Sequence, residues 1–257
     1  FAFFLICAFW QAYDNTIPLI LTNKFGLSQT ASGVIMALDN ILALFMLPLF
    51  GAISDRHKGK MGRRTPFILI GTIVAALAFV SLSFVDNHQL SNVQKFAAID
   101  DPEALAVIYE AQEGKTLMTP EGESFVLSEK FTEEEFTQIR SRTEQDGKST
   151  PNPDYTDYVV PARQACAKAM THAYPRTLIL FIALLLVALI AMATFRSPAV
   201  ALMPDVTIKP LRSKANAVIN LMGTAGGILV LVLRIVSRDD LSLMPKGDKI
   251  AKLLHIH

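Results

Sequence analysis

Two aspartates interrupt stretches of sequence that otherwise carry no charge. Asp14 is the single charged residue between Phe1 and Leu21, and Asp39 is the single charged residue between Ser32 and Ile53. Carboxylates kept in such apolar stretches mark ion or solute pathways, because burying them in hydrocarbon is costly unless they have a partner, water or a proton. Both residues are therefore candidates for binding a cation, with capping or hydrogen bonding between helices as the structural alternative.

Polar and aromatic residues surround these two aspartates at helical spacing. Trp10 and Gln11 lie about one helical turn before Asp14. The amide of Asn15 directly follows Asp14, and that of Asn40 directly follows Asp39. Planar amides can bind sugar hydroxyls, and an indole can pack on the apolar face of a sugar ring while its N–H donates a hydrogen bond. The candidate residues for solute or cation binding are therefore Asp14, Asp39, Trp10, Gln11, Asn15 and Asn40.

The elements that must position these residues are membrane-spanning helices. Hydrophobic residues make up 51% of the chain and charged residues 18%, with a mean hydropathy of +0.37; a typical soluble protein has about 25% charged residues. A bilayer core needs about 20 helical residues, and five stretches qualify: 1–21, 32–53, 66–85, 177–195 and 215–233. The composition excludes a disordered chain and a basic nucleic-acid binder, and two cysteines exclude a disulfide scaffold.

The distribution of Lys and Arg predicts the orientation of these spans. Five basic residues lie within 55–65 and three within 209–214, so both connections should be cytoplasmic. By parity the segment 86–173, which we call the outer segment, lies outside. The stretch 86–176 carries a net charge of minus seven against plus eight for the rest of the chain. We expect an all-α membrane protein in the cell membrane, organised as spans (1–85), outer segment (86–173), spans (174–236) and a polar tail (237–257).

The outer segment should fold as a small α+β insertion. Pro102 after Asp101 predicts a helix that ends at Gly114, and 115–128 predicts a hairpin. Thr132 and Glu135 form a capping-box pattern that opens a helix toward residue 143, and 161–173 predicts a last helix after a loop at 146–155. No nucleophile, phosphate-binding loop or metal-ligand spacing is present here. We therefore expect neither an enzyme nor a metal site, and no cofactor.

Two further features of the spans have structural explanations. Gly223, Gly226 and Gly227 should allow helices to approach closely. Arg196 is expected near the cytoplasmic surface, where it would snorkel or pair with Asp205.

The cytoplasmic connection carries a specific motif. GAISDRHKGKMGRRTP, residues 51–66, resembles the signature between the second and third helices of the major facilitator superfamily, with four extra residues after the first arginine. That lengthening is similar to the one in glycoside-pentoside-hexuronide cation symporters and sucrose-type transporters, as are YDNTIPLILTNKFGLS, ALDN and FRSPAVALMPDVTIKPLRSKANA. An acid paired with this basic cluster could lock one conformation. The gating candidates are Gly51, Asp55, Arg56, Gly62, Arg63, Arg64 and Asp205.

The resemblance implies a function, and it also implies more helices than we expect in this sequence. Family members couple the entry of a sugar to H⁺ or Na⁺ by alternating access, and carboxylates on the first two helices take part in coupling. They have twelve helices in two halves, whereas five are expected here. We therefore expect the amino-terminal part of such a symporter, which needs its carboxy-terminal half or a second copy of itself. The alternatives are a truncated, transport-inactive remnant and a membrane-anchored protein that binds or senses a ligand with its outer segment.

Overall fold

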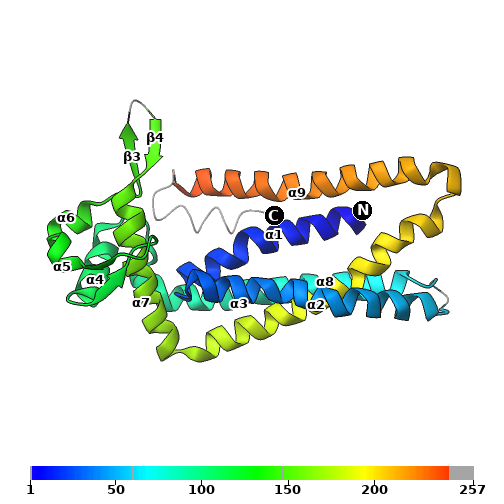
Figure 1. Cartoon of the computed structure of the whole chain (residues 1–257), viewed down its shortest axis with the longest axis horizontal. Helices are drawn as coiled ribbons and strands as arrows, with labels where there is room; N and C mark the ends of the chain where they lie inside the picture. The colour runs from blue at the N-terminus through cyan, green and yellow to red at the C-terminus, as the bar shows by residue number, and fades with distance from the viewer. Residues whose placement is uncertain (1, 60, 146–147, 243–257) are drawn as a thin grey trace. The chain divides into compact units, whose positions relative to one another are not determined.

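The computed structural model describes residues 2–59, 61–145 and 148–242 (Figure 1). Among these residues, five helices are long and apolar enough to cross a bilayer. They are α1 (Ala2–Asn23), α2 (Gln29–Arg56), α3 (Thr65–Ala97), α8 (Pro175–Val206) and α9 (Arg212–Ser242). The prediction of an all-α membrane bundle with five spanning helices is thus confirmed.

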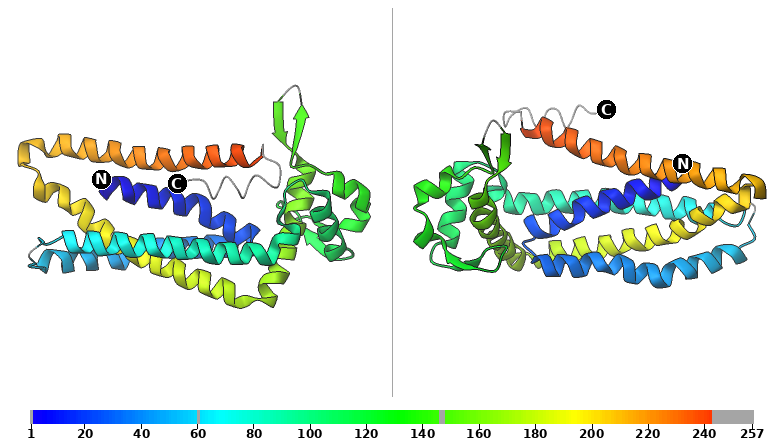
Figure 2. Two further views of the ribbon diagram at one scale, coloured as in Figure 1. Left: turned by 180° about the vertical axis from the view of Figure 1, so that it is seen from behind. Right: turned by 45° about the horizontal axis from the view of Figure 1, so that its top comes forward.

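The third long helix is longer than its apolar stretch. The predicted span ends at Val85, but α3 continues for three further turns to Ala97. Figure 2 shows the whole helix from two further sides. The extension remains helical because its apolar side is buried: Val93 and Phe96 belong to the core of the outer segment. Hydropathy alone finds the bilayer-crossing length and misses an extension whose apolar residues occupy only one face.

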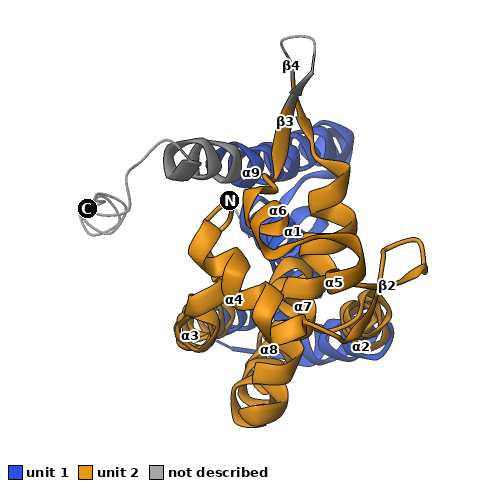
Figure 3. Cartoon of the chain, turned by 90° about the vertical axis from the view of Figure 1, so that its left-hand side faces the viewer, with its two compact units in different colours: residues 1–16, 44–72, 192–257 blue, residues 17–43, 73–191 orange. Residues whose placement is uncertain are grey.

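The chain divides into two compact units that cut across the long helices (Figure 3). The first unit holds residues 1–16, 44–72 and 192–257, and within it α9 packs on α1. A Cβ at Gly223 would lie 2.8 Å from Cys7 Sγ, and one at Gly226 would meet the carbonyl oxygen of Phe4. These glycines therefore serve close helix packing, as the sequence predicts.

The second unit holds residues 17–43 and 73–191 and includes the whole outer segment. The outer segment contains five short elements after α3: α4 (Pro102–Gln112), β1 (Thr116–Met118), β2 (Ser124–Val126), α5 (Leu127–Lys130) and α6 (Glu133–Gln138). A second hairpin, β3 (Arg142–Gln145) and β4 (Lys148–Pro151), precedes a π-helical turn (Tyr155–Val159) and α7 (Val160–Ala173). Both hairpins are antiparallel two-stranded sheets.

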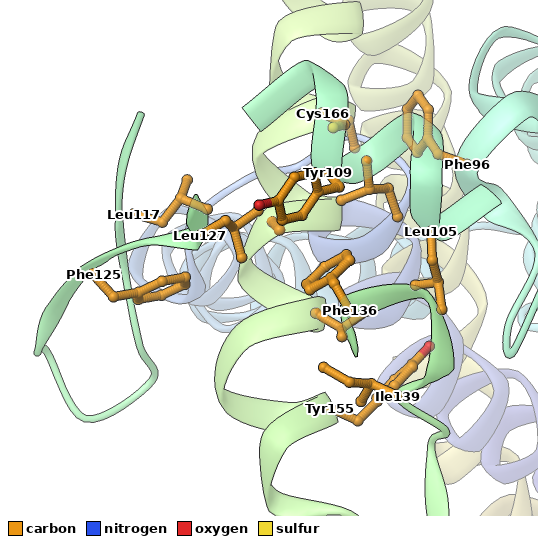
Figure 4. Packing of buried hydrophobic residues seen from close by; sticks show 14 of the residues in the cluster. Phe96, Leu105, Tyr109, Leu117, Phe125, Leu127, Phe136, Ile139, Tyr155 and Cys166 are labelled. Atoms are coloured by element: carbon orange, nitrogen blue, oxygen red, sulfur yellow. The ribbon is translucent and has the colours of Figure 1, made fainter. Parts of the chain in front are cut away.

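The outer segment has its own hydrophobic core, in which Leu105, Phe136 and Leu127 are fully buried (Figure 4). At the start of α6, the backbone N–H and the hydroxyl of Thr132 donate to the Glu135 carboxylate. These bonds hold the pKa of Glu135 below its ordinary value. The predicted capping box is confirmed, and the first hairpin and the last helix lie close to their predicted positions.

Two local predictions for the outer segment are wrong. The helix after Thr132 ends at Gln138 rather than near residue 143, and the predicted loop at 146–155 contains β4. Strands β3 and β4 consist mainly of polar residues, so they lack the alternation of apolar and polar residues that predicts a strand. Residues 146–147 of that loop, and 243–257 of the predicted tail, lie outside the described part of the chain; residues 237–242 continue α9.

Candidate functional site

An ion-pair network joins three segments of the first unit, and we call it the inner network (Asp55, Arg64 and Asp205). Arg64, just before α3, places Nη2 2.8 Å from Asp55 Oδ1 on the last turn of α2. Its Nε lies 2.5 Å from Asp205 Oδ2 at the end of α8. The Arg64 side chain is only 11% exposed, so its charge depends on these two carboxylates. The structure thus brings together three of the predicted gating residues.

Two glycines shape the backbone around the inner network. A Cβ at Gly51 would lie 3.0 Å from Ser197 Oγ, so this glycine lets α2 approach α8 closely. Gly62 has φ +87°, a left-handed conformation that side chains disfavour, and it turns the connection toward α3. Arg56 and Arg63 are exposed, and neither forms an ion pair within the described residues.

Trp10 is the centre of a second cluster in the same unit. Its ring meets that of Tyr13 edge to face, with centroids 5.7 Å apart. The guanidinium carbon of Arg196, on α8, lies 5.1 Å from the centroid of the Trp10 ring. Trp10 Nε1 is buried and finds no hydrogen-bond acceptor in the described part of the chain. A cation of α8 and an indole donor of α1 therefore meet in this unit.

The position of Arg196 corrects the expectation that it pairs with Asp205. Nine residues separate the two along α8, or about 14 Å of helix rise. That distance is too long for the two side chains to span, and Asp205 instead accepts from Arg64. Arg196 therefore lies farther into the apolar part of α8 than the inner network does, and it stacks on Trp10.

The remaining candidate residues lie on α1 and α2. On α1, Asn15 Nδ2 donates to the carbonyl oxygen of Gln11 at 2.8 Å, and Asp14 is exposed on the surface of its unit. On α2, the half-buried Asp39 accepts a hydrogen bond from the backbone N–H of Asn40 at 2.6 Å. Asp14 and Asp39 belong to different compact units. Their meeting in one cavity therefore stays a prediction.

Sequence reasoning missed a polar network where the membrane helices of the second unit join the outer segment. The fully buried Gln89 of α3 accepts from Thr177 Oγ1 at 2.8 Å and donates to the carbonyl of Lys24 at 3.0 Å. Lys24 also forms an ion pair with Asp86 at 2.6 Å, and Thr171 donates to the carbonyl of Phe25. The sequence does carry a signal for this network, because polar residues within 86–92 lie at helical spacing directly after the third apolar stretch.

Comparison with known proteins shows which family the amino-terminal part of the chain resembles. Residues 3–99, which hold nearly all of α1 and the whole of α2 and α3, match the family described as MFS/sugar transport protein. The amino-terminal part of this chain is major facilitator sugar symporter-like. A 73-residue stretch is 34% identical to an uncharacterized symporter, YnaJ, of Bacillus subtilis (strain 168).

The extent of these similarities is limited to one part of the chain. The stretch shared with the symporter covers 27% of this chain and 16% of that relative, so the chain spans a small part of the relative it matches. No solved structure matches the chain. The five apolar helices among the described residues make this a multi-pass membrane protein, and its residues 3–99 are similar to sugar transporters of the major facilitator type.

Proposed function

We propose that this chain forms the amino-terminal part of a secondary active transporter that couples the uptake of a sugar or glycoside to H⁺ or Na⁺ by alternating access. The observation that carries the proposal is the match of residues 3–99 to sugar transport proteins, together with the similarity to a symporter. We place the protein in the cell membrane with the inner network on the cytoplasmic side, because that side carries the excess of Lys and Arg.

The inner network supports alternating access. Arg64 links α3 to both α2 and α8, so its two ion pairs hold three helix ends together in this conformation. Movement of α8 away from α2 would break at least one pair, and rejoining them would restore it. We propose that this network, with Gly51, Arg56, Gly62 and Arg63 around it, holds the cytoplasmic side of the transporter in one state.

The coupling cation is proposed to bind at Asp14 and Asp39, and the sugar near Trp10, Gln11, Asn15 and Asn40. Carboxylate oxygens are ligands for Na⁺ and acceptors for a proton, whereas amides and an indole suit hydroxyls and a sugar ring. The carboxy-terminal half, or a second copy of the chain, supplies the rest of the path.

Uptake into proteoliposomes tests this function. The complete transporter that contains residues 1–257 is reconstituted, and labelled sugars are offered with an inward Na⁺ gradient, an inward H⁺ gradient or neither. We expect accumulation above the external concentration with one gradient and equilibration without it. Uptake that never exceeds equilibration with either gradient would show that the protein is not a cation-coupled transporter.

A second candidate function, binding or sensing of a ligand by the outer segment, rests on the hydrophobic core of its own that this segment has. The two functions predict different protected regions in hydrogen exchange of the intact chain with a sugar present. Transport predicts protection in α1 and α2, while ligand sensing by the outer segment predicts protection in α4 to α7.

A further inference from the structure

The connection between α1 and α2 is held at three consecutive residues. The carbonyl oxygen of Lys24 accepts a hydrogen bond from Gln89 of α3 at 3.0 Å. That of Phe25 accepts one from Thr171 of α7 at 2.9 Å. Gly26 lies so close to the backbone of α7 that a Cβ at this position would run into it. Connections between helices are ordinarily mobile surface segments, whereas this one is fixed by two helices.

An ion pair and a ring contact add to this attachment. Lys24 Nζ lies 2.6 Å from Asp86 Oδ2 on α3, and the two side chains are only 26% and 19% exposed. The Phe25 ring packs against that of Phe181 on α8, with centroids 5.1 Å apart, and both residues are fully buried. We call the three connection residues and their polar partners on α3 and α7 the outer joint (Lys24, Phe25, Gly26, Asp86, Gln89 and Thr171).

The outer joint should open rarely, because its central polar group is buried and paired. Gln89 is 0% exposed; its amide nitrogen donates to the Lys24 carbonyl, and its amide oxygen accepts from Thr177 of α8. A buried polar network whose members are paired is rigid. Opening it would also expose the rings of Phe25 and Phe181 to water, which is unfavourable.

The inner network is built differently. Its two carboxylates, Asp55 and Asp205, are 56% and 33% exposed. Ion pairs with exposed partners contribute little to stability, because water solvates the separated charges well. The free energy of opening the inner network is therefore smaller than that of opening the outer joint.

We propose that the outer segment is a structural clamp on the membrane helices. Through Thr171 and α7 it fastens the α1–α2 connection to α3 and α8, and the outer joint stays closed while the inner network opens. The clamp requires neither a ligand of the outer segment nor a transported solute. It gives the outer segment a role that the family resemblance does not supply, because the match to sugar transport proteins ends at residue 99, before α4.

Hydrogen exchange of the intact 257-residue chain in lipid nanodiscs tests the clamp, because hydrogen-bonded backbone amides lie at both networks. The N–H groups of Lys24, Phe25 and Leu27 donate to carbonyl oxygens of α1 and report on the outer joint. Those of Gly62 and Thr207 donate to carbonyl oxygens near them in the chain and report on the inner network. We expect protection factors at the outer reporters to be at least about tenfold higher than at the inner reporters.

Thr171→Val removes the hydroxyl that joins α7 to the connection and keeps the volume of the side chain. The carbonyl oxygen of Phe25 then loses its donor, so the outer reporters should exchange at least about fivefold faster, while the inner reporters exchange as in the parent. Thr156→Val is the control with the same chemical change. The hydroxyl of Thr156 also donates to a backbone carbonyl oxygen, that of Asn152, but its side chain is exposed. This variant should exchange like the parent.

Thermal unfolding shows whether each variant is folded. If Thr171→Val does not fold, Asp86→Asn decides in its place, because it removes the ion pair with Lys24 and leaves the contacts of Gln89 and Phe25 intact. It should accelerate exchange at the same outer reporters and leave the inner reporters unchanged.

Three results would overturn the clamp. They are equal protection at the outer and inner reporters of the parent, outer reporters that exchange at the parent's rate in the deciding folded variant, and equal acceleration in Thr156→Val. Because the chain is studied without a sugar or a cation gradient, none of these results depends on the outcome of the proteoliposome assay. The clamp and the transport function can therefore fail separately.

Discussion

At the scale of single residues, Arg64 is the predicted gating residue whose surroundings constrain it most. It is almost buried and serves two carboxylates on two different helices, whereas the neighbouring Arg63 is exposed. The sequence motif predicts that an acid pairs with the basic cluster, but it does not say which arginine is used. That choice depends on the turn at Gly62, which directs Arg64 toward α2 and α8.

Arg64→Gln should loosen the cytoplasmic ends of α2, α3 and α8. The variant leaves Asp55 and Asp205 without their cation, at a cost of about 1 kcal/mol because both acids are partly exposed. Hydrogen exchange should become faster in 50–66 and 200–207. Arg63→Gln is the matched control and should exchange like the parent; equal acceleration in both variants would show that the ion pairs are not the cause.

Residue types and spacing predict which helix carries each candidate residue better than they predict its contacts. Trp10, Gln11 and Asp14 share a helix, so their spacing in the sequence places them correctly on α1. The partner of Trp10 comes from α8, almost two hundred residues away, and neither hydropathy nor spacing predicts which face of α8 meets α1. The sequence therefore predicts the wrong partner for Arg196, which contacts Trp10 rather than Asp205.

At the scale of elements, glycines decide how closely helices approach. Gly226 and Gly227 are adjacent on α9, but a Cβ at Gly226 would meet the backbone of Phe4, whereas one at Gly227 would lie at an ordinary 3.7 Å from Gln11 Oε1. The sequence predicts close packing for this group of glycines as a whole. Only the structure separates the essential glycine from its neighbour.

Gly226→Ala should destabilise the contact of α1 with α9, because a backbone carbonyl cannot move aside for a methyl group. The expected cost is about 1–3 kcal/mol, as for other overpacked sites. Gly227→Ala should be close to neutral, since its neighbour is the end of a flexible side chain. Thermal unfolding in mild detergent measures both; a Gly227→Ala variant that is as unstable as Gly226→Ala would contradict this packing.

Gly26 is essential for a different contact, between the connection of α1 with α2 and the outer segment. It has φ +64°, and a Cβ there would run into the backbone of Gln164 and Lys168 on α7. Gly114 has a similar φ of +70° but open space around it. Gly114→Ala should therefore show only backbone strain, of about 1 kcal/mol.

Gly26→Ala should add the cost of the clash to that strain and should detach α7 from the connection. Limited proteolysis of the intact chain between residues 22 and 30 reports the detachment. We expect faster cleavage in Gly26→Ala than in Gly114→Ala. Equal cleavage in the two variants would mean that the contact with α7 does not hold the connection in place.

At the scale of the whole molecule, five apolar helices and the outer segment could be predicted from composition, because bilayer-crossing length and charge exclusion leave strong patterns. The internal structure of the outer segment could be predicted where capping and turn residues mark it, as at Thr132, and not where polar strands pair in β3 and β4. The polar contacts around Gln89, which link α3 to α7 and α8, required the folded structure.

The orientation that we predict from the charge asymmetry can be measured independently of transport. A single reactive cysteine at Ser124, an exposed residue of β2, should be labelled by an impermeant thiol reagent in intact cells in a background where Cys7 and Cys166 are replaced. A cysteine at His57, in the basic connection, should react only after the cells are opened. The opposite result would reverse the assignment of every connection.

The central claim, that a cation gradient drives this transporter through carboxylates on α1 and α2, is tested most directly by comparing accumulation with exchange in Asp14→Asn and Asp39→Asn. Both are measured in proteoliposomes containing the complete transporter, with Asp154→Asn, at an exposed site in the outer segment, as the control. We predict that each amide variant loses gradient-driven accumulation while sugar exchange continues, because the cation loses its ligand but the hydroxyl contacts remain. Accumulation that stays fully gradient-driven in both variants would contradict the account.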